Sequence, residues 1–226
     1  MNDLSDIWSA VFLTLKLSLV STFSLVIIAT PVSWWLACSK KAWKEAVAAI
    51  LALPVVLPPT VIGFYLLIAL GPKGPGGLIA RLYGNESLAF SFTGLVIGSI
   101  IYSLPFVVQP IRNSFEAVGQ GPIDAALSLR ASKWDAFWSV VVPLSRSGLI
   151  SGAVLGFAHT VGEFGVVLMI GGNIPGETRV LSVAIYEYVE MLQWRKAHVL
   201  SGALLLFSFA VIFFTQLFGR QSKKDE

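Results

Sequence analysis

The sequence contains few of the groups from which catalytic and metal sites are built. Its 226 residues include one cysteine and two histidines, and Asp, Glu, Lys and Arg together make up only 13% of the chain. The single cysteine, Cys38, excludes an intramolecular disulfide, and the two histidines, His159 and His198, fall on different predicted helices. Neither a G-x-S-x-G segment nor a G-x-x-x-x-G-K-S/T segment is present. We therefore expect no cofactor, no metal centre and no catalytic residue in this chain.

The same scarcity of charge excludes a soluble globule. Hydrophobic residues make up 55% of the chain, and the mean hydropathy is +0.77. Because a spanning helix needs about 20 apolar residues, the chain has room for about five or six spans and for no separate soluble domain. We predict an all-α integral membrane protein in which residues 1–226 form a single transmembrane domain. The net charge of +3 is small and its basic residues are spread over the loop ends, which excludes a nucleic-acid-binding stripe.

Five apolar runs are the predicted spans. They cover residues 7–38, 47–70, 88–108, 147–170 and 199–218. The second run contains Pro54, Pro58 and Pro59, which free backbone carbonyl groups inside a membrane helix. Such a break is tolerated where neighbouring helices or a water-lined cavity satisfy those groups, so a packing kink and a pore-lining break both remain open. Residues 71–87 are rich in Gly and Pro and are expected to form a loop.

Basic residues are distributed unequally between the two sets of predicted loops. With the N-terminus outside, the basic residues of the inner loops and tail are Lys40, Lys41, Lys44, Arg112, Arg130, Lys133, Arg146, Arg220, Lys223 and Lys224. Those of the outer loops are Lys73, Arg81, Arg179, Arg195 and Lys196. By the positive-inside rule, this bias predicts an N-terminus outside the cell and a C-terminus in the cytoplasm.

The stretch 123–144 is a moderately polar interval between the third and fourth spans. Its apolar residues at helical spacing are Ile123, Ala126 and Leu127, and then Trp134, Phe137, Trp138 and Val141. Two short amphipathic helices joined by a turn are predicted, each with its apolar residues on one face. Pro143 is expected to end the second helix, because its ring cannot continue one. The small pair Ala125-Ala126 lies just before the turn, where another protein can approach closely.

This stretch resembles the cytoplasmic EAA loop of the membrane subunits of ABC importers. The residues that carry the resemblance, and that it implies to be the coupling residues, are Asp124, Ala125, Ala126, Arg130, Phe137 and Pro143. That family usually has Glu at the position of Asp124 and Gly at the position of Arg130. The first difference keeps the charge, and the second leaves the sharp turn either at Arg130 or shifted to Ser132. The resemblance implies an ABC importer permease fold, in which residues 113–146 form a coupling loop that docks on an ATP-hydrolysing subunit. An ordinary interfacial loop is the alternative.

The fourth predicted span combines a small-residue stripe with ionisable side chains. Gly148, Gly152 and Gly156 recur at every fourth position, which predicts close packing against another helix. His159 and Glu163 follow, separated by one helical turn. An ionisable pair inside a span is costly, so it marks either a functional site or two groups that satisfy each other.

His159 and Glu163 are also candidates for residues along the route of a substrate. A negatively charged Glu163 would repel an anion, which favours a gating or structural role over ligand binding. The candidate residues of the translocation path or gate are His159, Thr160, Glu163 and Asn173.

The segments GEFG at 162–165 and GNIPGETR at 172–179 are similar to those of molybdate importer permeases. Related sulfate permeases have a similar first segment but, as we judge the resemblance, lack the PGETR run. The proline cluster at 53–59 and the SLPF segment at 103–106 fit as well, so the resemblance covers nearly the whole chain.

The resemblance implies a non-catalytic subunit in the cell (inner) membrane. It would contact lipid and pair with a second copy of itself around a central pathway. Its other implied partners are a cytoplasmic ABC ATPase dimer and an extracytoplasmic oxyanion-binding protein, and its substrate is molybdate, with tungstate as a further candidate. Two alternatives remain: a sulfate or thiosulfate permease, because these oxyanions have similar shape and charge, and a small intramembrane enzyme that uses His159 and Glu163.

Overall fold

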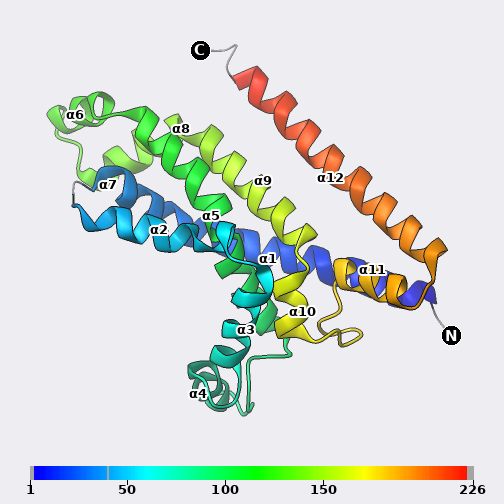
Figure 1. The fold of residues 1–226 in the computed structure, drawn as a ribbon. Coiled ribbons are helices and arrows are strands. Elements are labelled where there is room, and N and C mark those ends of the chain that lie inside the picture. Colours follow the sequence, from blue (N-terminus) through cyan, green and yellow to red (C-terminus); the bar gives the residue numbers. More distant parts are fainter. Residues whose placement is uncertain (1–2, 40, 223–226) are drawn as a thin grey trace.

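Three long helices form the centre of the molecule. The computed structural model describes residues 3–39 and 41–222, and these residues form helices and loops without a strand. Helix α1 (Asp3–Cys38) runs along the length of the bundle, and α5 (Phe92–Val118) and α9 (Arg146–Gly162) pack on it and on each other (Figure 1). The fold is therefore all-α, as predicted.

The second predicted span is two helices and not one. Helices α2 (Trp43–Val56) and α3 (Pro59–Leu70) meet at a bend of 111°. Leu57, directly before two prolines, has extended backbone angles (φ −76°, ψ 139°). A residue that precedes proline is disfavoured in the α-helical region, and Pro58 and Pro59 donate no backbone hydrogen bond, so the helix breaks here.

The fourth predicted span is also interrupted. Helix α9 ends at Gly162, and the short helix α10 (Gly165–Gly171) begins after Glu163 and Phe164. Glu163 has extended backbone angles (φ −67°, ψ 132°). A Cβ atom on Gly165 would lie 2.7 Å from Cβ of Pro59, so the two breaks in the chain meet at this contact.

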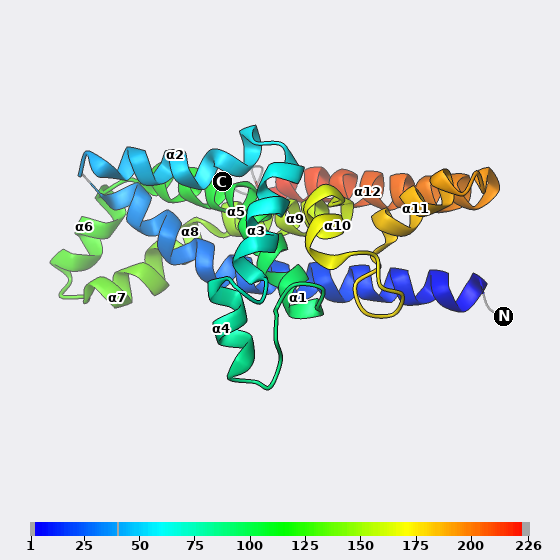
Figure 2. The same cartoon turned by 60° about the horizontal axis from the view of Figure 1, so that its bottom comes forward.

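Two short helices lie in regions where the sequence predicts none. Helix α4 (Pro75–Arg81) forms within the predicted loop 71–87, and it begins with a proline, whose fixed φ angle suits the first helical turn. It projects away from the bundle (Figure 2). Helix α11 (Leu181–Glu190) precedes the last helix, α12 (Trp194–Ser222). Both helices are shorter than a membrane span, so neither produces the long apolar run by which a span is predicted from sequence.

The segment between α5 and α9 contains the two predicted helices and more. Helix α5 continues to Val118, ten residues beyond the predicted end of the third span at 108, because Ile111 and Phe115 are buried against the bundle. The helices that follow are α6 (Gly121–Ser128), α7 (Lys133–Ala136), the π-helical turn η1 (Phe137–Val141) and α8 (Val142–Leu144).

Pro143 does not end the second helix of this segment, and that prediction was wrong. It lies in the first turn of α8, where its missing N–H group needs no partner, and the helical path ends at Ser145. The chain then bends by 70° into α9.

The described residues contain between three and five membrane spans. Helices α1, α5 and α12 are long and apolar enough to cross a bilayer, and two bent pairs raise the number to five if each pair is one span. These pairs are α2 with α3 and Lys133–Leu144 with α9. The upper number agrees with the prediction of about five spans, and no sixth is found in the part of the chain that is described.

The glycine stripe packs α9 against α5 of the same chain. A Cβ atom on Gly148 would lie 2.2 Å from Cβ of Ser114, and one on Gly156 would lie 2.6 Å from Cγ2 of Val107. For Gly152 the carbonyl oxygen of Val107 would be 3.1 Å away. The predicted close packing is confirmed, and it lies within one subunit.

We expect Gly148→Ala to destabilise the protein, because the added methyl group would overlap Ser114 and the Pro110 carbonyl, which cannot move without shifting α5. Overpacking of this kind costs about 1–3 kcal/mol. Thermal unfolding of the purified protein in detergent measures the effect. Gly202→Ala in α12 is the control, since a Cβ atom there meets nothing within 4 Å. Equal stability of the two variants would contradict the packing described here.

Candidate functional site

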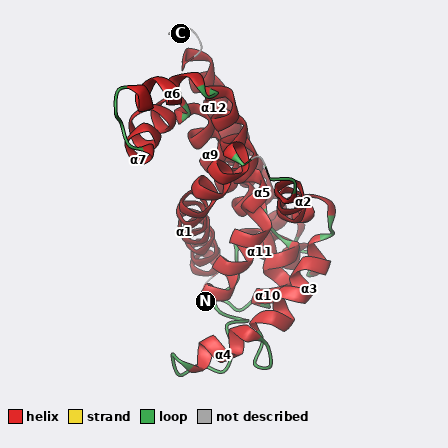
Figure 3. Ribbon diagram, turned by 90° about the vertical axis from the view of Figure 1, so that its left-hand side faces the viewer, coloured by secondary structure: helices red, strands yellow, loops and turns green. Residues whose placement is uncertain are grey.

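The segment α6–α7 forms one end of the molecule and exposes large apolar side chains. It lies at the opposite end from α4 (Figure 3). Leu129 is 85% exposed, Trp134 71% and Trp138 61%. Aromatic side chains exposed together with other apolar groups are typical of surfaces that bind another protein. This coupling surface, defined by α6, α7 and the turn between them, is the first part of the candidate site.

The turn between α6 and α7 lies at Arg130. This residue has a positive φ of 65°, in the left-handed region that favours glycine. The N–H of Ala131 donates to the carbonyl oxygen of Ala126 (3.1 Å), which closes the turn. The sharp turn has therefore not shifted to Ser132: Arg130 adopts the strained conformation at the position where the resembling family has Gly.

Ser132 begins α7 and holds it through a reciprocal cap. Its hydroxyl group accepts a hydrogen bond from the N–H of Asp135 (3.1 Å), and the Asp135 carboxylate accepts from the Ser132 N–H (3.1 Å). Hydrogen bonds from the side chain and backbone of Ser132 lower the pKa of Asp135. The cap fixes the direction in which α7 leaves the turn.

The predicted coupling residues divide between the surface and the core. Asp124, Ala125 and Pro143 are exposed, and Ala126 is half-buried. Phe137 is buried, and its ring contacts Trp34 of α1 at a centroid distance of 5.2 Å. Phe137 thus anchors the segment to the bundle.

The predicted common face of the second amphipathic helix was wrong. Phe137 and Val141 are buried, whereas Trp134 and Trp138 point outward. The reason is that residues 134/138 and 137/141 are two separate i,i+4 rows on neighbouring sides of the helix, and only the row of Phe137 and Val141 faces the bundle. The two exposed indoles are consequently available to a partner.

A buried polar layer separates two apolar clusters inside the bundle. Along α1, Ser21 lies between Leu17 of one cluster and Leu25 of the other. Along α5, Ser99 and Ser103 lie between Leu95 and Val107 in the same way. All three serines are fully buried. Thr160 and Glu163 of the α9–α10 region, also buried, belong to the same layer.

His159 is held in this layer by α5. Its Nδ1 atom lies 2.9 Å from the hydroxyl oxygen of Ser103, and its ring stacks on Phe106 with 3.9 Å between centroids. Thr160 donates to the carbonyl oxygen of Gly156 (2.9 Å) and lies 3.2 Å from the Ser103 hydroxyl. Ser103 therefore joins the two candidate residues, a role that the sequence analysis did not assign because Ser103 is distant in the chain.

Glu163 does not pair with His159, so the mutual satisfaction of these two side chains is excluded. The helix ends at Gly162, and the one-turn spacing that would bring them together is lost. Glu163 is only 4% exposed, and Ser99 of α5, also fully buried, is a polar neighbour of its carboxyl group. A glutamate is rarely buried without a charged partner, and the described residues give this one none, so its position requires a physical reason.

Asn173 belongs to a separate network in the loop between α10 and α11. Its side-chain oxygen accepts from Nε of Arg179 (2.8 Å), and its nitrogen donates to Glu187 (3.2 Å). Arg179 and Glu187 also form an ion pair at 3.1 Å. Asn173 therefore fixes this loop, and the structure does not bring it together with His159 and Thr160.

The fold has close counterparts among membrane subunits of ABC transporters. The MetNI methionine ABC transporter matches with a TM-score of 0.74 and 17% identity, over 98% of this chain and 99% of that one. A bacterial alginate ABC transporter, solved with an alginate pentasaccharide-bound periplasmic protein, matches with a TM-score of 0.74 and 16% identity, over 96% and 79%. At this identity the similarity concerns the fold alone.

Other proteins are considerably more similar to this chain in sequence than these solved structures are. The molybdenum transport system permease of Azotobacter vinelandii is 54% identical over 91% of both chains, and that of Haemophilus influenzae is 37% identical over 80% of both. A probable sulfate transport system permease of Zygnema circumcarinatum is 32% identical, over 91% of this chain and 70% of that one.

The family model of binding-protein-dependent transport system inner membrane components matches residues 29–223. The chain belongs to this family. It is a multi-pass inner-membrane permease, a non-catalytic subunit of a binding-protein-dependent ABC importer.

Proposed function

We propose that this chain is the permease through which an ABC importer carries molybdate into the cell. The observation that carries the proposal is the 54% identity to a molybdenum permease over nearly the whole of both chains, against 32% for a sulfate permease. The PGETR run at 175–179 supports the same choice. Tungstate has the same charge and tetrahedral shape as molybdate, and the proposal includes it as a second substrate.

The coupling surface is the proposed docking site of the ATPase. Its exposed residues Leu129, Trp134 and Trp138 supply the apolar and aromatic anchors that protein interfaces use. Ala125, exposed beside them, allows close approach. The bend at Ser145 joins this surface to α9, so a force applied to the surface reaches the centre of the bundle.

A second copy of the chain is the proposed partner inside the membrane. Only 11% of the most apolar window of α12 is buried, against 50% for α5, so α12 has a large surface left to cover. A second copy and lipid would share that surface. The extracytoplasmic binding protein would then approach the opposite end, where α4 and the Asn173 loop lie.

The N-terminus is proposed to lie outside and the C-terminus in the cytoplasm. Described basic residues at the end that carries the coupling surface include Lys41, Lys44, Arg130, Lys133 and Arg146. This distribution supports the orientation by the positive-inside rule. Lys40, Lys223 and Lys224, which were counted in the prediction, lie outside the described residues.

The substrate is tested by uptake of radiolabelled molybdate into cells that lack their own molybdate importer. We expect uptake only when this chain is expressed together with its ATPase and binding protein. Unlabelled tungstate should compete, and an excess of sulfate should not, because the binding protein delivers its own ligand. Sulfate-inhibited uptake would favour the sulfate alternative, and uptake by this chain alone would contradict an ATP-driven importer.

We further propose that the break at Glu163 is part of the gate, the region that opens and closes the route. Burial of its carboxyl group is costly, and a conformation in which the group meets water or a cation would relieve that cost. His159 and Thr160 lie in the same polar layer and would move with it. A costly buried group of this kind suits a segment that must change conformation during each transport cycle.

Substitutions at Glu163 test this proposal. Glu163→Gln preserves the shape of the side chain but removes the acid group, so we expect an assembled complex with altered uptake. Glu163→Met removes the buried carboxyl group, so we expect a higher unfolding temperature in detergent and slower uptake. Wild-type uptake by both variants would contradict a role in gating and leave Glu163 as a structural residue.

A further inference from the structure

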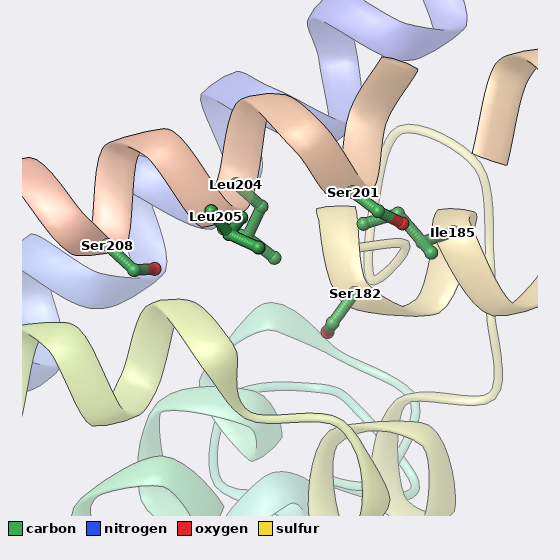
Figure 4. A pocket seen from close by; sticks show the side chains of 6 residues that line it. All are labelled: Ser182, Ile185, Ser201, Leu204, Leu205 and Ser208. Carbon is green, nitrogen blue, oxygen red and sulfur yellow. The ribbon is translucent and has the colours of Figure 1, made fainter. Parts of the chain in front are cut away.

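A cavity of about 330 Å³ lies between α11 and α12 and is lined by both polar and apolar side chains. Its hydroxyl groups come from Ser182 of α11 and from Ser201 and Ser208 of α12 (Figure 4). Its apolar lining consists of Ile185, Leu204 and Leu205. None of the described charged side chains lines it, and it is open to the outside of the single subunit.

The hydroxyl groups of this region are gathered on the cavity. Helix α11 contains one Ser or Thr residue, Ser182, and the described side chains of α12 include two, Ser201 and Ser208. All three line the cavity, whereas Val199 and Leu206 lie on the opposite face of α12. In a helix that faces only lipid, hydroxyl groups would have no reason to share one face, so this face of α12 meets either another helix or a polar route.

The cavity adjoins the proposed gate. The Ser182 hydroxyl group donates a hydrogen bond of 2.5 Å to the backbone carbonyl oxygen of Glu163. Phe157 of α9 contacts Phe207 of α12, next in the chain to Ser208, with 6.2 Å between ring centroids. These two contacts tie the cavity walls to α9 and to the break that follows it. A change at the break would consequently change the shape of the cavity.

We propose that this serine-lined cavity forms part of the route of the tetrahedral oxyanion, an inference that rests on the function proposed above. Hydroxyl groups donate hydrogen bonds to anion oxygens. Ser201 and Ser208 are separated by about 10 Å along α12, so an anion that moves along the helix would bind to one hydroxyl group and then to the other. Without a lysine or arginine in the lining, the dianion is solvated but not trapped. Conduction requires binding that is weak enough for release.

Cysteine substitution tests the cavity directly. In a Cys38→Ser background, Ser201→Cys and Ser208→Cys are treated in assembled transporter with methanethiosulfonate ethylsulfonate, a charged thiol reagent that does not enter lipid. We expect both positions to react and molybdate uptake to fall by about tenfold, because the attached sulfonate fills the route and repels an anion. Added molybdate, with the complete transporter turning over, should slow the reaction. Leu206→Cys, inside the span and on the opposite face of α12, is the control and should neither react nor lose uptake.

Three results would overturn the proposal. Reaction of the cavity cysteines only with an uncharged, lipid-soluble maleimide would mean that lipid fills the cavity. Disulfide formation between two copies, without reaction toward the charged reagent, would mean that a helix of the second copy fills it. Complete labelling with unchanged uptake would place the route elsewhere. Absence of molybdate uptake by the unsubstituted transporter would count against the proposed function and not against this site.

Discussion

The close approach of α9 to α5 is the contact on which the rest of the structure depends. Gly148, Gly152 and Gly156 leave no room between the two helices for a side chain, so the backbone of α9 is fixed against α5 along its length. In a membrane, where apolar surface gains little from leaving lipid, such van der Waals contact is a main source of helix association. A helix fixed in this way can carry a displacement from one end to the other without bending.

The two ends of α9 are the places where function is proposed. At one end, the bend at Ser145 leads to the coupling surface, and at the other the helix breaks at Glu163. The break is supported from the second interrupted segment, since α3 packs on α10 and Pro59 occupies the space that a side chain at Gly165 would need. The docking surface and the polar layer are thus connected by one helix.

Periodic features of the fold could be predicted from the sequence, and interruptions could not. Hydrophobic runs predict the spans, and the four-residue spacing of glycines predicts the packing face of α9. The amphipathic pattern at 123–144 predicts the two helices of the coupling surface. The turn at Arg130 was left open because its left-handed backbone is imposed by the helices on either side and not by arginine itself. The apolar pattern at 134–141 is wider than the stripe that the bundle covers, so the outward direction of Trp134 and Trp138 was missed.

In the candidate site, too, the sequence did not predict which side chains contact each other. Spacing alone places His159 and Glu163 one helical turn apart. The helix ends at Gly162, however, and this end separates the two side chains. His159 instead contacts Ser103, which is 56 residues away in the chain. Contacts between distant segments decide such pairings, and one sequence does not contain them. The residues that the motif identified are nevertheless in the region where two broken helices meet.

Binding and activation of the ATPase subunit by an Ala125→Arg variant test the central claim most directly. Ala125 is exposed in the isolated chain, so arginine leaves the fold intact, while a close-packed interface has no space or hydration for it. The account predicts normal insertion, loss of co-purified ATPase and loss of substrate-stimulated ATP hydrolysis in proteoliposomes. Ala42→Arg, at another exposed alanine outside the α6–α7 segment, should retain both. An Ala125→Arg variant that keeps its ATPase and its coupled hydrolysis would show that α6 is not the docking element.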